Sequence, residues 1–211
     1  MISRILNCIY VIFLRFLLTF GVDRQNESVM SYIKADLYRF AASVDLNKAY
    51  KIILNEPGFQ FAFFLRLASL QPKSAWRKRV HAISYFFHKK YFFKFGYQIP
   101  ICTRIGKGFQ ILHFGQIIFN PSAQIGENCT IFPGVTIGQD KDGFSPVIGN
   151  KVWIGSNSII VGGIIIGNNV LIAPGSYVNF NVPDNCLVIG NPGKFIVKSV
   201  NITDGYLNNV I

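Results

Sequence analysis

Apolar residues recur at every sixth position over most of the second half of the chain, from Ile99 to Val178. A period of six fits neither an amphipathic helix nor an alternating strand, because those repeat every 3.6 and every 2 residues. It is the signature of a parallel β-helix, in which each hexad supplies one short strand and a turn. The predicted inward positions are Ile99, Ile105, Ile111, Phe119, Ile125, Ile131, Ile137, Ile148, Ile154, Ile160, Ile166, Ile172 and Val178.

These thirteen positions predict a little over four coils, because three hexads make one triangular coil. Successive coils stack at the strand spacing of about 4.8 Å. The residue after an inward position is often glycine, and the residue four places on is small or aliphatic. Cys129 occupies one of these small inward positions, so we expect it to be a core residue.

The repeat is interrupted twice. The step from Ile111 to Phe119 is eight residues and the step from Ile137 to Ile148 is eleven. The first interruption predicts a two-residue bulge in "GFQILHFGQIIF" that contains His113, and the second a five-residue loop within "GQDKDGFSPV". Departures from an otherwise strict repeat mark places where the surface serves something other than stacking. Both are therefore candidate site segments.

His113 is the one histidine that falls in a break of the repeat. An imidazole titrates near neutral pH, so it could take the proton of a substrate hydroxyl as that oxygen attacks an electrophilic carbonyl. The alternative is a histidine that only caps the bulge backbone. His81 and His88 lie in a basic aromatic segment and are expected to be ordinary surface or interhelical residues.

The first half of the chain reads as helical. Apolar residues at three- and four-residue spacings run through "SYIKADLYRFAASVDLNKAYKIIL", which "EPGFQ" is expected to break. "FAFFLRLASL" follows, then a break at Pro72 and the run "WRKRVHAISYFFHKKYFFKF". Three or four helices are predicted over residues 31–95. The fold class is therefore α+β, with an N-terminal α-helical domain at 1–96, a β-helix at 97–197 and a C-terminal tail at 198–211.

The segment "ILNCIYVIFLRFLLTF", residues 5–20, is strongly apolar and predicts a helix within residues 1–22. It is shorter than the roughly 20 residues that span a bilayer, and it contains Asn7 and Arg15. No small-residue cleavage site follows, which argues against a secretory signal. Three readings stay open: packing on this protein or a sister subunit, an interfacial membrane helix, and a true span.

The chain is basic, with 21 Lys and Arg against 10 Asp and Glu. No acidic residue occurs from Pro57 to Gly126. This span could form a solvated basic helix face, or it could meet an anionic phosphate, a polysaccharide or a lipid surface. No nucleic-acid-binding motif accompanies the charge. The four cysteines show no metal-ligand spacing or disulfide framework, which predicts no metal and a reduced, cytoplasmic protein.

The step "ILHFGQIIF", followed by "SAQIGENCTIFPGVTIG", resembles the segment of serine O-acetyltransferases that holds a catalytic histidine in an equivalent bulge. "IKADLYR" and "EPGFQFAFFLRLASL" are similar to the helical domain of those enzymes. The resemblance covers about residues 31–197 and places the chain with the hexapeptide-repeat acyltransferases. It implies a trimeric left-handed parallel β-helix that uses acetyl-CoA, bound between the coils of neighbouring subunits. His113 would be the general base of a direct attack, without an acyl-enzyme.

The resemblance also implies a path for acetyl-CoA. Its thioester arm would run along the later coils, and "GNPGKFI" resembles the closing CoA-contact motif of the family. Lys194 also suits this role by charge, as a counter-ion for phosphate. The residues carried over are Gly138, Ser156, Ala173, Pro174, Asn191, Pro192 and Lys194.

The chain departs from serine acetyltransferases at places that contact the acceptor. Gln98 stands where those enzymes have the Asp that orients the histidine, and its amide could accept from the imidazole N–H. Leu112 replaces an acidic residue that binds the serine amine, and Phe144 and Ser145 replace an Arg-His pair for the carboxylate. The resemblance therefore points away from free serine.

A sugar acceptor makes no demand for such charges, because its hydroxyls can be met by neutral groups. Gln98, Gln116 and Ser145 could supply them, together with backbone groups. Asp140 and Asp142 lie in the loop and could replace the missing acid that orients His113 or bind the acceptor.

The expected function is an acetyl-CoA-dependent O-acetyltransferase that acts on a sugar hydroxyl in capsule, exopolysaccharide or lipopolysaccharide biosynthesis. We expect a cytoplasmic homotrimer or higher oligomer, with peripheral contact at the inner face of the membrane left open. One alternative is serine O-acetyltransferase of cysteine biosynthesis. Another is a non-catalytic β-helix scaffold, against which His113 argues because a scaffold has no need of it.

Overall fold

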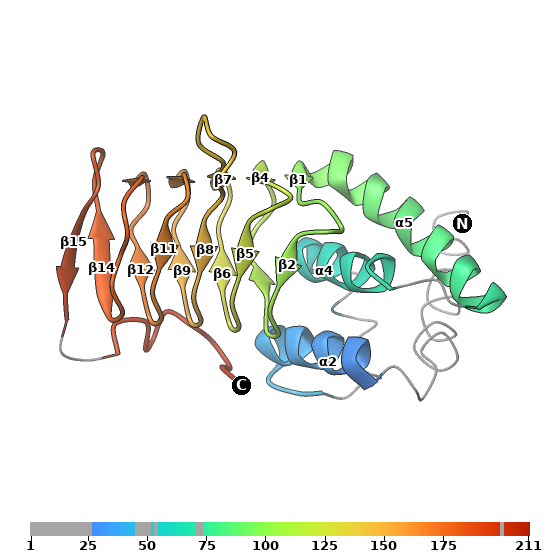
Figure 1. The fold of residues 1–211 in the computed structure, drawn as a ribbon. Coiled ribbons are helices and arrows are strands. Elements are labelled where there is room, and N and C mark those ends of the chain that lie inside the picture. The colour runs from blue at the N-terminus through green and yellow to red at the C-terminus, as the bar shows by residue number, and fades with distance from the viewer. Residues whose placement is uncertain (1–26, 45–51, 53–54, 71–73, 199–200) are drawn as a thin grey trace.

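The computed structural model describes residues 27–44, 52, 55–70, 74–198 and 201–211. The predicted apolar helix at residues 1–22, with its membrane alternatives, lies outside these ranges. Within them, no helix is long and apolar enough to cross a bilayer. Helices α2 (Glu27–Ala41), α4 (Pro57–Ala68) and α5 (Ala75–Phe95) lie at one end of a stack of short strands (Figure 1).

The strands form three sheets, named A, B and C here, that run along the stack. All neighbouring strands pair in parallel, except for the last pair of sheet C, β14 and β15. Sheet A contains β1 (Tyr97–Gln98), β4 (Ile117–Phe119), β7 (Thr136–Gly138), β10 (Ile159–Val161) and β13 (Tyr177–Val178). Sheet B contains β2 (Arg104–Ile105), β5 (Gln124–Ile125), β8 (Val147–Ile148) and β11 (Ile165–Ile166). Sheet C contains β3 (Gln110–Ile111), β6 (Thr130–Ile131), β9 (Trp153–Ile154), β12 (Leu171–Ile172), β14 (Cys186–Ile189) and β15 (Lys194–Val197).

The predicted inward positions form the core of the stack. All thirteen are buried, and the most accessible, Ile105, is 7% exposed. Cys129 is fully buried, as predicted. The bulge with His113 lies between β3 and β4, and the predicted loop lies between β7 and β8. The predicted class, a helical domain followed by a parallel β-helix, is confirmed.

The predicted coil number is too small. Sheet A holds five strands in the described chain, so the stack has about five turns. The chain continues inward past Val178 with Val182, which bridges to Ile166, and then with Val188 on β14. The step from Val178 to Val182 is four residues, which hides the period at this point.

The predicted break at "EPGFQ" is wrong in its extent. The interruption ends at Glu56, because Pro57 is already the first residue of α4. Proline fits there because the first turn of a helix does not use its backbone N–H groups. A Cβ on Gly58 would lie 2.0 Å from the carbonyl oxygen of Ile111, so glycine lets α4 pack directly against β3.

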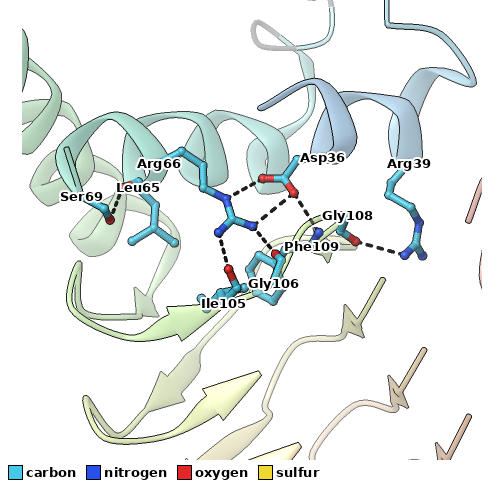
Figure 2. Close-up of polar contacts among 9 residues, drawn as sticks. All are labelled: Asp36, Arg39, Leu65, Arg66, Ser69, Ile105, Gly106, Gly108 and Phe109. Carbon is cyan, nitrogen blue, oxygen red and sulfur yellow. Dashed lines mark hydrogen bonds and ion pairs between the residues drawn. The ribbon is translucent and has the colours of Figure 1, made fainter. Parts of the chain in front are cut away.

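A buried ion pair joins the helices to the first coil (Figure 2). Arg66 of α4 donates from Nε to Oδ2 of Asp36 on α2 at 2.8 Å. Its other nitrogens donate to the carbonyl oxygens of Ile105 and Gly106, at 2.7 and 2.6 Å. The backbone N–H of Phe109 donates to Asp36 Oδ1 at 2.8 Å. Both charges are thus partnered where α2, α4 and the first coil meet.

A second buried cation, Arg39, ties α2 to the coils and to the C-terminal tail, residues 201–211. Its guanidinium donates to the carbonyl oxygen of Gly108 at 3.0 Å and to Thr130 Oγ1 at 2.8 Å (Figure 2 shows the first). It also donates to the carbonyl oxygen of Asn208 at 2.6 Å. Burial lowers the pKa of Arg39 to about 10, so the side chain stays charged at neutral pH.

The tail runs back over the outer face of sheet C toward α2 (Figure 1). Tyr206 packs edge-on against Trp153 of β9, with ring centroids 5.5 Å apart. The side-chain amide of Asn128 makes two bonds to the backbone of Ile211. Its Nδ2 donates to the carbonyl oxygen at 2.8 Å, and its Oδ1 accepts from the N–H at 3.2 Å. Leu171, which faces outward on this sheet, is only 5% exposed. The tail therefore covers sheet C.

Candidate active site

The bulge at residues 112–116 has a backbone that few side chains adopt. His113 has a φ of +62°, in the left-handed region, where histidine is enriched among non-glycine residues. Gly115 has a φ of +150°, and a Cβ there would lie 2.9 Å from Pro133 Cβ. Backbone in sparsely populated regions costs of order 1–3 kcal/mol and clusters at functional sites. Turns of other coils hold Asn128, Lys151 and Asn157 in the same region, so this backbone shapes the bulge but does not by itself mark a site.

Tyr97 fixes this backbone from inside the coil. Its hydroxyl donates to the carbonyl oxygen of His113 at 2.6 Å, and its side chain is fully buried. Burial raises the pKa of Tyr97 well above its usual value, so the phenol remains a neutral donor. The carbonyl oxygen of Gly96, the C-cap of α5, accepts from the backbone N–H of Ile117 at 3.0 Å. The end of α5 and the first coil thus position the bulge.

The imidazole of His113 is exposed and, within the described chain, has no hydrogen-bond partner. The ring of Phe132 lies beside it, with centroids 5.8 Å apart. Gln98, predicted to orient the imidazole, is exposed on sheet A in register with Ile118. The structure contains no bond between Gln98 and His113. Both imidazole nitrogens are therefore available to a ligand.

Four predicted acetyl-CoA contacts lie on the same edge of the β-helix as His113. This edge, between sheets C and A, carries the turns that follow β3, β6, β9 and β12. Ser156 and Ala173 are partly exposed there, and Pro174 is exposed. Ser156 and Gly175 belong to successive coils, because the Gly175 N–H donates to the Ser156 carbonyl oxygen at 2.8 Å. Asn191 lies in the turn after β14, the next one along this edge.

The rest of the "GNPGKFI" segment forms the turn from β14 to β15. Pro192 and Lys194 are both exposed, and Lys194 opens β15. The ammonium group of Lys194 has no carboxylate partner among the residues that the structure describes. It is therefore free to meet an anion.

Gly138 and the long loop lie at the opposite edge of sheet A. Gly138 ends β7 in register with Val161, and the loop with Asp140, Asp142 and Ser145 follows directly. Within one chain, the strands of sheet A separate these residues from His113. The structure therefore does not bring the two predicted halves of the site together in a single subunit.

Asp140 organises the loop. Its carboxylate accepts from the backbone N–H groups of Phe144, Asp142 and Gly163, at 2.9, 3.0 and 3.1 Å. The bond from Phe144 is the largest cause of the lowered pKa of Asp140, so this carboxylate stays ionised. Its role here is structural, and it does not contact His113.

Besides Asp140, the loop carries two exposed charged side chains, Lys141 and Asp142. Ser145 Oγ donates to Asn120 Oδ1 at 2.9 Å. Phe144 is 64% exposed and borders a hollow of about 800 Å³ that also touches Tyr177. This hollow lies beside the loop and away from the bulge.

Of the predicted acceptor-binding residues, Leu112 and Gln116 lie in the bulge with His113. Leu112 is partly exposed, and its N–H donates to the Ile131 carbonyl oxygen at 3.1 Å, which keeps it in the ladder. Gln116 is exposed. In this chain the immediate neighbours of His113 are therefore uncharged.

Sequence reasoning missed Tyr97 and Phe132. Phe132 follows an inward isoleucine, where this repeat often has glycine, as at Gly126 and Gly155, and no other such position holds an aromatic residue. A large side chain at this place, one coil below the bulge, was a usable signal. The sequence holds no signal for the role of Tyr97, because its hydroxyl donates to a backbone carbonyl oxygen, which every residue has.

The remaining histidines are not part of this site. His88 is 1% exposed, its Nε2 lies 3.0 Å from the Ile99 carbonyl oxygen, and its ring packs 4.9 Å from that of Phe61. Burial lowers the pKa of His88 to about 4, so it is neutral at pH 7. This confirms the predicted interhelical packing for His88. His81 is half-buried on the same helix.

Among the described residues, no group of three His, Cys, Asp or Glu side chains could hold a metal ion. Cys102, Cys129 and Cys186 are free thiols, of which Cys102 is exposed.

Several known proteins are similar to this chain. Residues 145–179 match the family model "Bacterial transferase hexapeptide (six repeats)". The putative colanic acid biosynthesis acetyltransferase WcaB of Escherichia coli is 43% identical over 102 residues, which cover 47% of this chain and 63% of that protein. The serine acetyltransferase of Synechococcus elongatus is 34% identical over 107 residues, covering 49% of this chain and 44% of that protein. This chain therefore spans less than two thirds of either relative.

A solved structure extends the likeness to the helical half. The serine acetyltransferase of Neisseria gonorrhoeae, in complex with serine, superposes with a TM-score of 0.62 at 30% identity. The match covers 83% of this chain and 70% of that one. The likeness thus includes both the helices and the coils.

Proposed function

Because this chain belongs to the hexapeptide-repeat acyltransferases, we propose that it is an acetyl-CoA-dependent O-acetyltransferase with His113 as general base. The observation that carries the proposal is the exposed imidazole of His113, which has no partner in the described chain although Tyr97 fixes its backbone. A structural histidine would use a ring nitrogen in the fold, as His88 does through Nε2. The imidazole of His113 is left for a substrate.

The proposed step is a direct acyl transfer. When bound, acetyl-CoA supplies the activated thioester carbonyl. His113 accepts the proton of the acceptor hydroxyl while that oxygen bonds to the carbonyl carbon. The carbon–sulfur bond then breaks, and the imidazolium returns the proton to the departing sulfur. General base catalysis of this kind contributes about 10² to 10⁴ in rate.

The proposed path of acetyl-CoA is the edge between sheets C and A. Ser156 and Ala173 have small side chains that leave this edge open beyond His113, and Lys194 offers a positive charge at the far end. A phosphate-bearing ligand with a slender arm suits such a row. Asn191 and Pro192 would lie near the nucleotide end, next to Lys194.

The proposed acceptor is a sugar hydroxyl of a capsule, exopolysaccharide or lipopolysaccharide unit. The uncharged side chains of Leu112, Phe144 and Ser145 support it, because no charge stands at these three matched positions to pair with the ammonium or carboxylate of free serine. An unpaired ion in a closed site costs several kcal/mol, enough for discrimination of about 10² or more. The likeness to WcaB, named for colanic acid biosynthesis, points the same way.

Serine O-acetyltransferase is the second candidate. The relatives of that name and the serine-bound structure with its matching helical half favour it. For this activity, Asp142 or a neighbouring subunit would have to supply the missing charges, since Asp140 is committed to the loop backbone.

The test is a thiol-release assay that compares L-serine with surface-glycan oligosaccharides at equal concentration, with mass spectrometry of the products. We expect acetylated oligosaccharide and almost no turnover of serine. Serine turnover near the median enzyme rate of about 10 s⁻¹ would establish the second candidate instead. Transfer to no acceptor of either class would favour the non-catalytic scaffold.

We also propose a homotrimer, and the separation of the two predicted site halves supports it. Gly138 and the loop lie at one edge of sheet A and His113 at the other, so packing of one subunit's loop edge against the next subunit's bulge edge would unite them. The outer faces of sheets A and B carry exposed apolar side chains that could support such packing, including Ile159, Val147 and Ile165. Sedimentation that shows an active monomer at micromolar concentration would contradict this part.

Location is part of the same proposal. We expect a cytoplasmic enzyme that makes peripheral contact with the inner face of the membrane, where growing glycans are held.

A further inference from the structure

Helix α5 carries an exposed aromatic ridge. Its buried stripe consists of Val80, Ser84, His88 and Tyr91, which repeat at three- and four-residue spacings. Phe86 and Phe93 point the opposite way, because residues in an α-helix follow one another at about 100°. They are 64% and 77% exposed. The two rings are seven residues, or about 10 Å, apart along the helix.

Basic side chains flank this ridge on both sides. Lys78 and Lys89 lie on one side and Arg79 and Lys90 on the other, by the same helical geometry. Ala82 continues the ridge between them. The helix contains no Asp or Glu, and the nearest acidic residues in the sequence are Glu56 and Glu127. The exposed face of α5 therefore combines two aromatic rings with four basic side chains and no acidic one.

The flanking charges are not neutralised within the described chain. The one ion pair recorded there is Arg66–Asp36, on the other side of α4. Lys89 instead lies over the ring of Phe92 at 4.8 Å and Lys90 over that of Phe87 at 5.9 Å. These ammonium groups are therefore available to an anionic partner.

We propose that α5 docks this protein on an anionic lipid bilayer, with Phe86 and Phe93 inserted at the interface and Lys78, Arg79, Lys89 and Lys90 among the lipid phosphates. A soluble anionic polymer would use the charges but would leave the aromatic ridge in water. A bilayer satisfies both, because its interface takes up aromatic rings and its anionic headgroups attract each nearby basic residue.

The position of α5 agrees with this role. It forms an outer margin of the helical end of the molecule and extends from β1 away from the stacked sheets (Figure 1). It ends at Gly96, whose carbonyl oxygen bonds the strand that follows the His113 bulge. Docking through α5 would thus hold the candidate active site within one coil of the membrane-bound helix.

The experiment measures co-sedimentation of the full chain with vesicles of phosphatidylcholine alone and of phosphatidylcholine with 30% phosphatidylglycerol. We expect binding to the anionic vesicles only. F86S/F93S and K89E/K90E should each lower the bound-to-free ratio at least about tenfold, since each basic residue near an anionic surface contributes about 1 kcal/mol, or fivefold. The matched control K151E/K198E changes the charge equally on exposed coil residues and should bind within about twofold of the unchanged chain.

Four results would overturn the proposal. They are no binding of the unchanged chain to anionic vesicles, equal binding to both vesicle types, α5 variants that bind as the unchanged chain does, and an equal loss in K151E/K198E. The third result would assign binding to another segment. Sedimentation velocity of F86S/F93S without lipid is the second readout. An oligomer that dissociates in this variant would make the ridge a subunit contact and would also overturn the proposal.

Discussion

Two polar regions of this protein meet the first coil on either side of β3 and differ in almost every physical respect. At the seam between the helices and the first coil, Asp36 and Arg66 are buried and have every charged atom bonded (Figure 2). At the bulge, His113 is exposed, has a left-handed backbone and leaves its imidazole without a protein partner. The seam thus holds the fold together, and the bulge leaves one side chain free for chemistry.

The difference teaches where to look for function in such a repeat. A charged group with all its partners supplied by the chain cannot also serve a substrate without breaking those contacts. A polar group whose backbone is fixed and whose side chain is unused can. By this criterion Asp140 has a structural role, as Asp36 and Arg66 do, although it lies in a candidate site loop. Its carboxylate accepts from three backbone N–H groups.

Asp36→Ala should have the largest effect on stability. It removes the carboxylate from a buried pair and leaves the charge of Arg66 uncompensated, which typically costs about 3–5 kcal/mol. Denaturant unfolding measures the loss. Asp204→Ala is the control, because Asp204 is exposed in the tail, and it should stay within about 0.5 kcal/mol. Equal effects of the two would mean that the seam is not a stability element.

His88 should make stability depend on pH. Its pKa is about 4 in the folded protein, because of burial, against an ordinary value of 6.5. The unfolded chain therefore binds the proton more tightly, so stability is complete above pH 6.5 and falls as the pH drops toward 4. The expected loss over this window is about 3 kcal/mol. Lys89 is the charged neighbour that also disfavours the imidazolium.

His88→Gln removes this titration while keeping a polar side chain. Unfolding at pH 4, 5, 6 and 7 should show a flatter profile than that of the unchanged protein. An identical slope in both proteins would assign the pH dependence to other groups.

Tyr97→Phe should have a smaller effect on stability and should also lower turnover. It removes one hydrogen bond, to the His113 carbonyl oxygen, worth about 1 kcal/mol of stability. We expect turnover to fall about tenfold, with the KM for acetyl-CoA nearly unchanged, because the bulge loses its fixed position. Tyr206→Phe, which removes an exposed hydroxyl and keeps the ring on Trp153, should leave turnover as it was. A change in KM alone would contradict a positioning role for Tyr97.

The core of the β-helix could be predicted from the sequence because its rule is local. An inward residue such as Ile131 is buried in its coil whatever packs outside, so the six-residue period is enough to place it. The bulge was visible for the same reason, since an insertion stands out against a strict period. The last turn was missed where the period shortens at Val182.

The seam could not be predicted because it depends on contacts between distant segments. Asp36 and Arg66 are 30 residues apart, and their partnership follows from how α2 and α4 meet the first coil. The start of α4 was misread because Pro57 and Gly58 are also typical of a break. The contact of Gly58 with Ile111 explains that glycine, and only the packed structure reveals it.

The account depends most directly on the claim that His113 serves chemistry and not the fold. The deciding measurement is His113→Gln, with transfer from acetyl-CoA to the protein's own acceptor and denaturant unfolding determined on the same preparation. We expect turnover to fall at least about 10², with unfolding within about 0.5 kcal/mol of the unchanged protein and CoA binding retained. Near-normal turnover, or a loss of activity that only follows a loss of stability, would contradict the account.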